Sequence, residues 1–156
     1  MTGIVWFGEK KLTLEDVWDI ARRVRTPRLS ERADVRERIV RSAAFVDKTI
    51  RHGGVIYGVT TGYGDSCETE IPAELIHELP IHLSRYHRCG MGRFLTDEET
   101  RAVMAVRLSS LVQGWSGVTL DLVRLLADML RLDILPLIPA EGSVGASGDL
   151  TPLSYV

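Results

Sequence analysis

Apolar residues recur at helical spacing along most of this chain, and this pattern constrains its fold more than any other feature. One segment with a strong apolar pattern comprises residues 102–112. It follows Thr96 and Glu99, which are predicted to form a capping box. The broadest apolar face lies within 120–132 and comprises Leu122, Val123, Leu125, Leu126, Met129 and Leu130. We therefore predict a mainly α protein. The breadth of these faces indicates partner helices that this chain lacks.

The N-terminal segment has a different pattern. Residues 4–7 read Ile-Val-Trp-Phe and are followed by Gly8 and by residues 10–12, Lys-Lys-Leu. Short runs of this kind around a glycine are typical of extended structure. We predict a small hairpin-like element of strands before the first helix.

Three further helices are predicted before Thr96. Thr13 with Asp16 resembles a capping box at the start of the first. The predicted ranges are 14–24, which Pro27 stops, 31–52, which ends at Gly53 and Gly54, and 72–87. In the second helix, the residues expected near one face are Ile39, Ala43, Phe45 and Ile50. Pro136 and Pro139 then break the chain after the last long helix.

Residues 142–149 read Gly-Ser-Val-Gly-Ala-Ser-Gly-Asp, and their centre holds a tripeptide that can become an electrophile. If the amide nitrogen of Gly148 attacks the carbonyl carbon of Ala146 and two waters leave, one with the hydroxyl of Ser147, a five-membered ring with an exposed methylene carbon results. No ordinary side chain is an electrophile of that kind. The glycine allows the tight closure. Taken alone, the tripeptide is more typical of a turn entering a helix, with Ser147 or Asp149 as its cap.

A second glycine-rich stretch, residues 57–64, reads Tyr-Gly-Val-Thr-Thr-Gly-Tyr-Gly. The pair resembles the ammonia-lyase and aminomutase family acting on histidine, tyrosine and phenylalanine. Its members carry Tyr-Gly-Val-x-Thr-Gly-Tyr/Phe-Gly and Gly-Ala-Ser-Gly-Asp-Leu-x-Pro-Leu-Ser, and this chain matches the second motif at 145–154. The resemblance implies the N-terminal part of an ammonia-lyase-like helical fold, with a short strand region and a glycine-rich catalytic loop. It also implies that Ala146, Ser147 and Gly148 form a 4-methylidene-imidazol-5-one group autocatalytically, without metal or nucleotide.

By the same resemblance, Tyr63 is the base that removes a β-proton from an amino-acid substrate. This elimination needs an electrophile to capture the amine and a positioned base. A free tyrosine has a pKa of about 10, so the phenol of such a base must be ionised or nearly so. We expect backbone N–H groups of Gly62, Gly64 and the neighbouring threonines to lower the pKa of Tyr63. Taken alone, Tyr63 would be interpreted as a turn aromatic that packs on the core.

Substrate contacts are implied at the end of the helix after the tyrosine loop. The family carries a short pair there that contacts the substrate side chain, and the matching residues are Tyr86 and His87. A histidine at a helix C-terminus is also favoured by the helix dipole alone. Many relatives have Gln and Asn where this chain has Pro80 and His82, so we expect different hydrogen bonds in the pocket and a helix that begins or kinks near Pro80. Histidine, tyrosine and phenylalanine all stay open as substrates.

Composition excludes several other functions. Nineteen Lys and Arg balance 21 Asp and Glu, for a net charge of −2, and no alternation of basic and aromatic residues indicates nucleic-acid binding. No apolar stretch approaches a membrane span and no signal peptide is present, so we expect a cytoplasmic protein. Cys67 and Cys89 are interpreted as reduced, incidental thiols, and no residue spacing indicates a metal site.

The chain is short for the family that it resembles. Relatives have several hundred residues, a central helical bundle, a homotetramer and active sites assembled from three subunits. These 156 residues are therefore interpreted as a single N-terminal ammonia-lyase region, truncated before most of the bundle. The leading hypothesis is an ammonia-lyase that gives an α,β-unsaturated acid from histidine or an aromatic L-amino acid. Its alternatives are an aminomutase, and a non-catalytic remnant or one half of a split enzyme.

Overall fold

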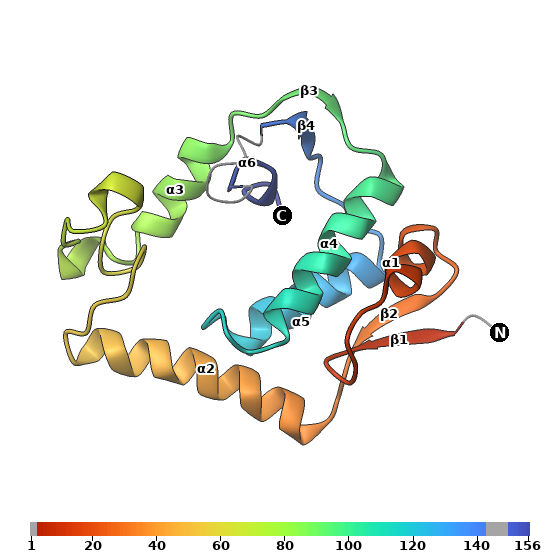
Figure 1. Cartoon of the computed structure of the whole chain (residues 1–156), viewed down its shortest axis with the longest axis horizontal. Helices are drawn as coiled ribbons and strands as arrows, with labels where there is room; N and C mark the ends of the chain where they lie inside the picture. The colour runs from red at the N-terminus through yellow and green to blue at the C-terminus, as the bar shows by residue number, and fades with distance from the viewer. Residues whose placement is uncertain (1–2, 143–149) are drawn as a thin grey trace. The chain divides into compact units, whose positions relative to one another are not determined.

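The computed structural model describes residues 3–142 and 150–156, and Figure 1 shows its elements. The described part is mainly helical, which confirms the predicted fold class. In chain order, the elements are β1 (Ile4–Phe7), α1 (Leu14–Ala21), β2 (Thr26–Leu29), α2 (Ala33–Arg51), the 3-10 helices η1 (Gly64–Ser66) and η2 (Ala73–Leu75), α3 (Leu79–His87), β3 (Met91–Phe94), α4 (Asp97–Leu111), α5 (Leu120–Arg131), β4 (Pro139–Glu141) and α6 (Leu150–Leu153).

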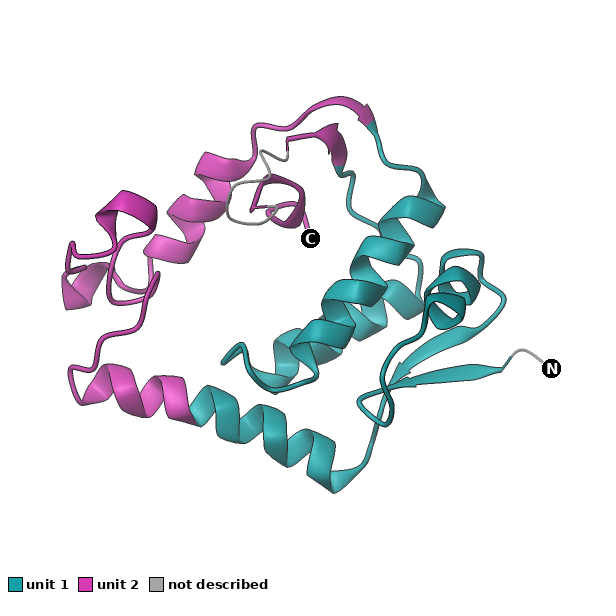
Figure 2. Cartoon of the chain, in the orientation of Figure 1, with its two compact units in different colours: residues 1–44, 94–138 teal, residues 45–93, 139–156 magenta. Residues whose placement is uncertain are grey.

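The chain forms two compact units, coloured separately in Figure 2. Unit 1 comprises residues 1–44 and 94–138, and unit 2 comprises residues 45–93 and 139–156. Among the described helices, none is long and apolar enough to cross a membrane.

The two N-terminal strands of unit 1 do not form the predicted hairpin. β1 pairs in parallel with β2, so that Ile4 lies opposite Thr26 and Phe7 opposite Leu29. Residues 10–12 contribute only an isolated bridge between Phe7 and Lys10. The expected hairpin is therefore wrong, because a parallel pair needs a crossover, here α1, rather than a tight turn.

Helix α1 begins as predicted and ends early. The Thr13 hydroxyl accepts from the Asp16 amide, and the Asp16 carboxylate accepts from the Thr13 amide, which completes the capping box. The helix stops at Ala21 rather than at 24, because Arg23 adopts a left-handed conformation with φ of 62°. Pro27 is thus not what stops this helix. It lies inside β2, where its missing N–H leaves one fewer donor on the strand.

The core of unit 1 lies where α1 and α5 pack against α4, with β2 against α5. The capping box predicted from Thr96 and Glu99 is present at the start of α4. Of the predicted face of α5, Leu122 and Leu125 are instead exposed. The fully enclosed large hydrophobic side chains from these elements are Ile20, Met104, Leu108, Val123 and Leu130.

A buried arginine joins three helices of unit 1. Arg101 on α4 is only 3% exposed and donates to the carbonyl oxygens of Ile20, 2.8 Å away, and Leu130, 2.9 Å away, at the ends of α1 and α5. Its guanidinium also pairs with Asp133. Arg23 pairs with the same carboxylate at 2.9 Å. The arginine thereby satisfies carbonyls that helix ends leave without partners.

Helix α2 differs from its predicted face. Its buried residues are Val35 and Ile39, whereas Phe45 is 68% exposed. The segment 72–87 also differs from one continuous helix: it contains η2 and then α3, with Pro80 in the first turn of α3. A proline in the first turn costs no hydrogen bond, which explains why the helix begins there.

Unit 2 has a loosely buried interior. Among the described residues, every buried hydrophobic side chain of the chain belongs to unit 1. In unit 2, strands β3 and β4 pair in a two-stranded sheet that the sequence did not predict. The large apolar side chains that unit 2 exposes include Phe45, Val55, Tyr57, Ile81, Tyr86 and Met91.

Candidate functional site

Two threonines hold the glycine-rich loop of unit 2 in shape. The hydroxyl of Thr60 accepts from the Ile56 amide at 2.8 Å. The buried hydroxyl of Thr61 accepts from the Gly58 amide at 3.3 Å and donates to the Gly62 carbonyl at 3.0 Å. These hydrogen bonds use the hydroxyl groups of both threonines and stabilise the folded-back conformation of the loop.

The two tyrosines of this loop face each other. Their rings meet edge to face, with centroids 6.5 Å apart and planes at 82°. The hydroxyl of Tyr57 accepts from the backbone amide of Gly64 at 3.0 Å, and this residue is 65% exposed. The hydroxyl of Tyr63 is buried and has no hydrogen-bond partner in the described part of the chain. The two phenols of the loop therefore differ in environment: that of Tyr57 accepts a backbone hydrogen bond, and that of Tyr63 is buried without a described partner.

The expected lowering of the Tyr63 pKa is wrong for this chain. Burial raises the pKa of Tyr63, and the neighbouring Tyr57 raises it further. The amide of Gly64 donates to Tyr57, and the amide of Gly62 donates to the carbonyl of Thr69. Neither glycine amide predicted for the Tyr63 phenol is thus available to it, and the amide of Thr60 donates instead to the carbonyl of Ile56.

Glycine is required at one position between these rings. Gly58 has φ of 70°, and a Cβ there would lie 2.9 Å from Cε1 of Tyr63. Any larger residue would meet both a strained backbone and the ring. The glycine thus permits the close approach of Tyr63 to the loop.

Tyr86 and His87 lie together at the C-terminal end of α3. Their rings are 5.2 Å apart, and Tyr86 is 80% exposed. Nδ1 of His87 lies 2.9 Å from the carbonyl oxygen of Leu83. A carbonyl can only accept, so Nδ1 carries the proton of the neutral ring. Nε2 is then left as the acceptor nitrogen.

Residues 146–148, the predicted electrophile-forming tripeptide, lie outside the described residues, but both flanks are described. A Cβ at Gly142 would lie 2.5 Å from Cγ2 of Thr151 and 3.4 Å from Cα of Gly90. The two ends of the intervening segment therefore lie against each other.

The segment after the tripeptide is bound to the end of α3. Nε of Arg88 donates to the carbonyl of Ser154 at 2.9 Å, and the Gly90 amide donates to the hydroxyl of Tyr155 at 3.2 Å. The Arg88 guanidinium also lies over the Tyr155 ring, 5.8 Å from its centroid. Unit 2 thus joins the predicted substrate pair at the end of α3 to the chain that follows the tripeptide.

Sequence reasoning missed Tyr57 and Tyr155 as parts of this site. Tyr57 opens the glycine-rich motif, so the motif itself held the signal, but only the structure reveals which phenol receives a donor. No local pattern marks Tyr155, because its partner Gly90 is 65 residues away. Among the described residues, no cluster of metal-ligating side chains is present.

The aromatic amino acid lyase family matches residues 12–156. The chain belongs to this family. It is 39% identical over 156 residues to the histidine ammonia-lyase of Streptococcus gordonii, and it covers 30% of that protein.

Solved structures of other aromatic amino acid lyase relatives share this fold. The ergothionase of Treponema denticola, an ergothioneine-degrading enzyme, superposes with a TM-score of 0.89 at 28% identity, over 97% of this chain and 30% of that one. The tyrosine aminomutase of Streptomyces globisporus superposes with a TM-score of 0.88 at 33% identity, over 97% of this chain and 28% of that one. The described chain therefore has the N-terminal portion of the ammonia-lyase fold, as predicted, and spans about 30% of the length of its curated relatives.

Proposed function

We propose that this chain provides the electrophile-forming tripeptide and a tyrosine base of an ammonia-lyase. The enzyme would eliminate ammonia from histidine or an aromatic L-amino acid and leave an α,β-unsaturated acid. The observation that carries the proposal is that one unit contains both glycine-rich motifs, with the ends of the tripeptide segment in contact and the tyrosine loop held by Thr60 and Thr61.

The ring formed from Ala146, Ser147 and Gly148 would supply an electrophilic methylene carbon to capture the substrate amine. The proton must leave the β-carbon to a base in the same site. The chain's own residues supply that base from the tyrosine loop.

Tyr63 remains the base predicted from the sequence, but two observations support Tyr57 instead. A backbone N–H that donates to the Tyr57 oxygen stabilises negative charge on it, as a phenolate base requires. The same hydroxyl is exposed and accessible to a substrate, whereas that of Tyr63 is enclosed. We propose that Tyr63 then positions Tyr57 through its ring.

We propose that Tyr86 and His87 contact the substrate side chain. The His87 tautomer leaves Nε2 as an acceptor, which suits a substrate that presents an N–H or O–H group. The exposed Tyr86 ring offers an edge or a face to an aromatic substrate. L-Histidine and L-tyrosine each carry both an aromatic ring and an N–H or O–H group, so each suits this pair as a substrate.

Intact mass tests maturation directly. If the ring forms, the chain is two waters lighter than its sequence mass, and Ser147→Ala keeps the full mass. An unchanged mass of the parent chain would contradict autocatalytic ring formation in these residues.

Ammonia release tests the reaction. Since the chain spans about 30% of its curated relatives, residues 1–156 should be joined to the remaining sequence of the Streptococcus gordonii relative. We expect the chimera to release ammonia from L-histidine, L-tyrosine or L-phenylalanine, and Ser147→Ala to abolish the release. Release that persists in this variant would refute the role of the tripeptide.

An aminomutase is the second candidate, and the structural likeness to a tyrosine aminomutase favours it. Such an enzyme returns the amine to the β-carbon. Chromatography of the chimera's products separates the candidates, because only the aminomutase gives a β-amino acid.

We also propose that the chain assembles as a homo-oligomer. Exposed apolar side chains in a unit without buried ones favour association. Light scattering on the chain and on the chimera should give a mass above that of one chain, and a strictly monomeric chimera would contradict this proposal.

A further inference from the structure

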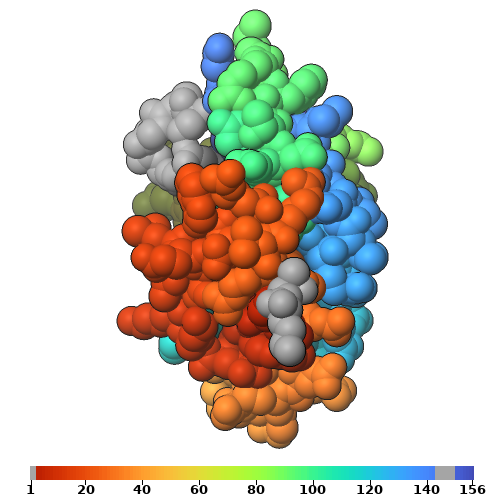
Figure 3. Space-filling view, turned by 90° about the vertical axis from the view of Figure 1, so that its right-hand side faces the viewer, coloured from red at the N-terminus to blue at the C-terminus, as the bar shows by residue number. Residues whose placement is uncertain are grey.

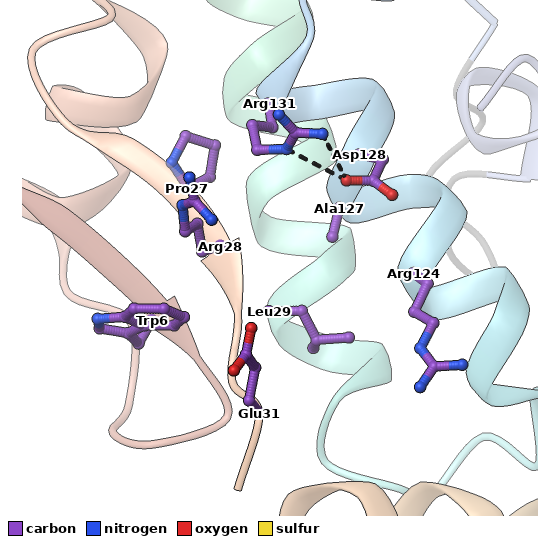
Figure 4. A pocket seen from close by; sticks show the side chains of 9 residues that line it. All are labelled: Trp6, Pro27, Arg28, Leu29, Glu31, Arg124, Ala127, Asp128 and Arg131. Carbon is purple, nitrogen blue, oxygen red and sulfur yellow. Dashed lines mark hydrogen bonds and ion pairs between the residues drawn. The ribbon is translucent and has the colours of Figure 1, made fainter.

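A hollow of about 150 Å³ lies between β2 and α5 on unit 1 (Figure 4). Figure 3 shows this face, where the red and orange surface of the N-terminal segments borders the blue surface of α5. Pockets for drug-sized ligands are usually larger, about 300–1,000 Å³. The occupant of this hollow is therefore small.

Part of the lining of the hollow is apolar. The lining includes Trp6 of β1, which lies opposite Arg28 in the pairing of β1 with β2, together with Pro27 and Leu29 of β2 and Ala127 of α5. A flat hydrocarbon or aromatic group is the part of a ligand that such a surface accommodates. The apolar residues thus select for shape.

The lining also contains charged groups of both signs. Its guanidinium groups belong to Arg28, Arg124 and Arg131, and its carboxylates to Glu31 and Asp128, which leaves one excess positive charge in the lining. Arg131 already pairs with Asp128 at 3.0 Å. Arg124 pairs outside the hollow with Asp121, which is 91% exposed.

Arg28 is the lining cation that is ready to bind. Among the described residues, its side chain has no ion pair or hydrogen bond, and it is exposed. A guanidinium presents a planar fork of donors that matches a carboxylate. Because Arg124 and Arg131 already have carboxylate partners, Arg28 is the one unpaired guanidinium of the lining among the described residues, and one guanidinium suits a monocarboxylate better than a phosphate dianion.

We propose that this hollow binds a small, flat monocarboxylate, with its carboxylate on Arg28 and its apolar part against Trp6 and Ala127. The α,β-unsaturated acid released by the reaction is a ligand of this class, and that identification rests on the proposed function. The hollow lies entirely in unit 1 and shares no residue with the tyrosine loop of unit 2. It is therefore a second site for the product.

Calorimetric titration of the 156-residue chain tests the site with three probes: trans-cinnamate, its neutral isostere trans-cinnamamide, and inorganic phosphate. We expect saturable binding of cinnamate and at least about tenfold weaker binding of the other two, because both lack the matched single carboxylate. Cinnamate should also shift the indole ¹H–¹⁵N signal of Trp6, with Trp18 and Trp115 as internal controls.

Arg28→Gln should weaken cinnamate binding at least about tenfold, whereas Arg41→Gln, an exposed arginine on α2, should leave it unchanged. Arg28 is exposed and without described partners, so the variant keeps its circular dichroism spectrum and melting temperature. Cinnamate binding that withstands Arg28→Gln, tighter binding of cinnamamide or phosphate, or an unmoved Trp6 signal would each overturn the site.

The two proposals can fail separately. If cinnamate binds at Arg28 but the chimera releases no ammonia, the proposed carboxylate site is supported and the proposed reaction is refuted. If ammonia is released but cinnamate does not bind the hollow, the reaction stands and the second site falls.

Discussion

The Tyr57 hydroxyl accepts a hydrogen bond from the Gly64 amide at 3.0 Å, and this bond distinguishes it from the enclosed phenol of Tyr63. The two residues belong to one eight-residue motif and differ in sequence context only by their place in it. Their difference in chemistry arises from the fold of the loop, which gives the donor to one and not to the other.

Substitution separates the roles of the two tyrosines. In the chimera, Tyr57→Phe should lower kcat by about 10³-fold, as expected for loss of a proton-transfer group. Tyr63→Phe removes only a hydroxyl that has no partner, so we expect a change of less than about tenfold. Steady-state ammonia release with L-histidine gives both values, and the reverse order would return the base to Tyr63.

Gly58 tests whether the loop geometry matters. Gly58→Ala combines a positive φ with a close approach to the Tyr63 ring, and should displace that ring and lower kcat. Gly53→Ala is the matched control: its φ is 68°, but a Cβ there meets nothing within 4 Å. Near-ultraviolet circular dichroism of the tyrosines should change only in Gly58→Ala, and equal changes in both would contradict the contact.

Arg101 should dominate the stability of unit 1. Arg101→Met removes the donor to two helix-end carbonyls and leaves Asp133 without its buried partner, so we expect a loss of about 3 kcal/mol in the free energy of unfolding. Arg41→Met on the exposed surface should change it by less than about 0.5 kcal/mol. Urea unfolding followed by circular dichroism measures both, and equal losses would mean that the buried network contributes little.

Asp16 should make unit 1 sensitive to acid. Burial raises the pKa of Asp16, but hydrogen bonds from Thr13, Lys10 and Arg25 outweigh it, and the pKa is lowered overall. A lowered pKa stabilises the fold above the unfolded value, about 3.9, and this stabilisation is lost as pH falls through the folded value.

Asp16→Asn should therefore unfold more easily at pH 7 and show less further loss between pH 5 and 2. Asp34→Asn is the control, because Asp34 also has a lowered pKa but sits in an exposed pair with Arg32. Melting temperatures across that range test the difference, and parallel pH profiles for Asp16→Asn and the parent chain would contradict it.

Local signals predicted the starts of α1 and α4 well, whereas α3 begins at Leu79 rather than at 72. The boxes at Thr13 and Thr96 are formed by residues three apart, so the sequence contains the whole interaction. Strand pairing was not predictable in this way, because β1 finds β2 only after α1 has crossed between them. The end of α1 depends on Arg23, whose left-handed conformation accompanies ion pairs to Asp97 and Asp133, far away in the chain.

For the candidate site, too, the sequence predicted local features but not the contacts between them. Motif spacing predicted the tyrosine loop and the tripeptide, which stay predictions, and the predicted helix end at residue 87 is confirmed, because α3 ends at His87. The roles of Tyr57 and Tyr63 depend on which amide points at which oxygen, and a motif does not contain that information. The exposure of Phe45 on α2 has a similar origin, because a helical face becomes core only where another element covers it.

The confinement of buried hydrophobic side chains to unit 1 has a consequence for local unfolding. Backbone amides in unit 2 are protected by hydrogen bonds that little apolar packing supports, so their opening should cost much less free energy than that of α4. Under hydrogen exchange, the tyrosine loop and α3 would exchange early while α4 and α5 stay protected. The proposed catalytic residues thus lie in the most easily opened part of the described chain, and a ligand or partner that binds there should slow its hydrogen exchange most.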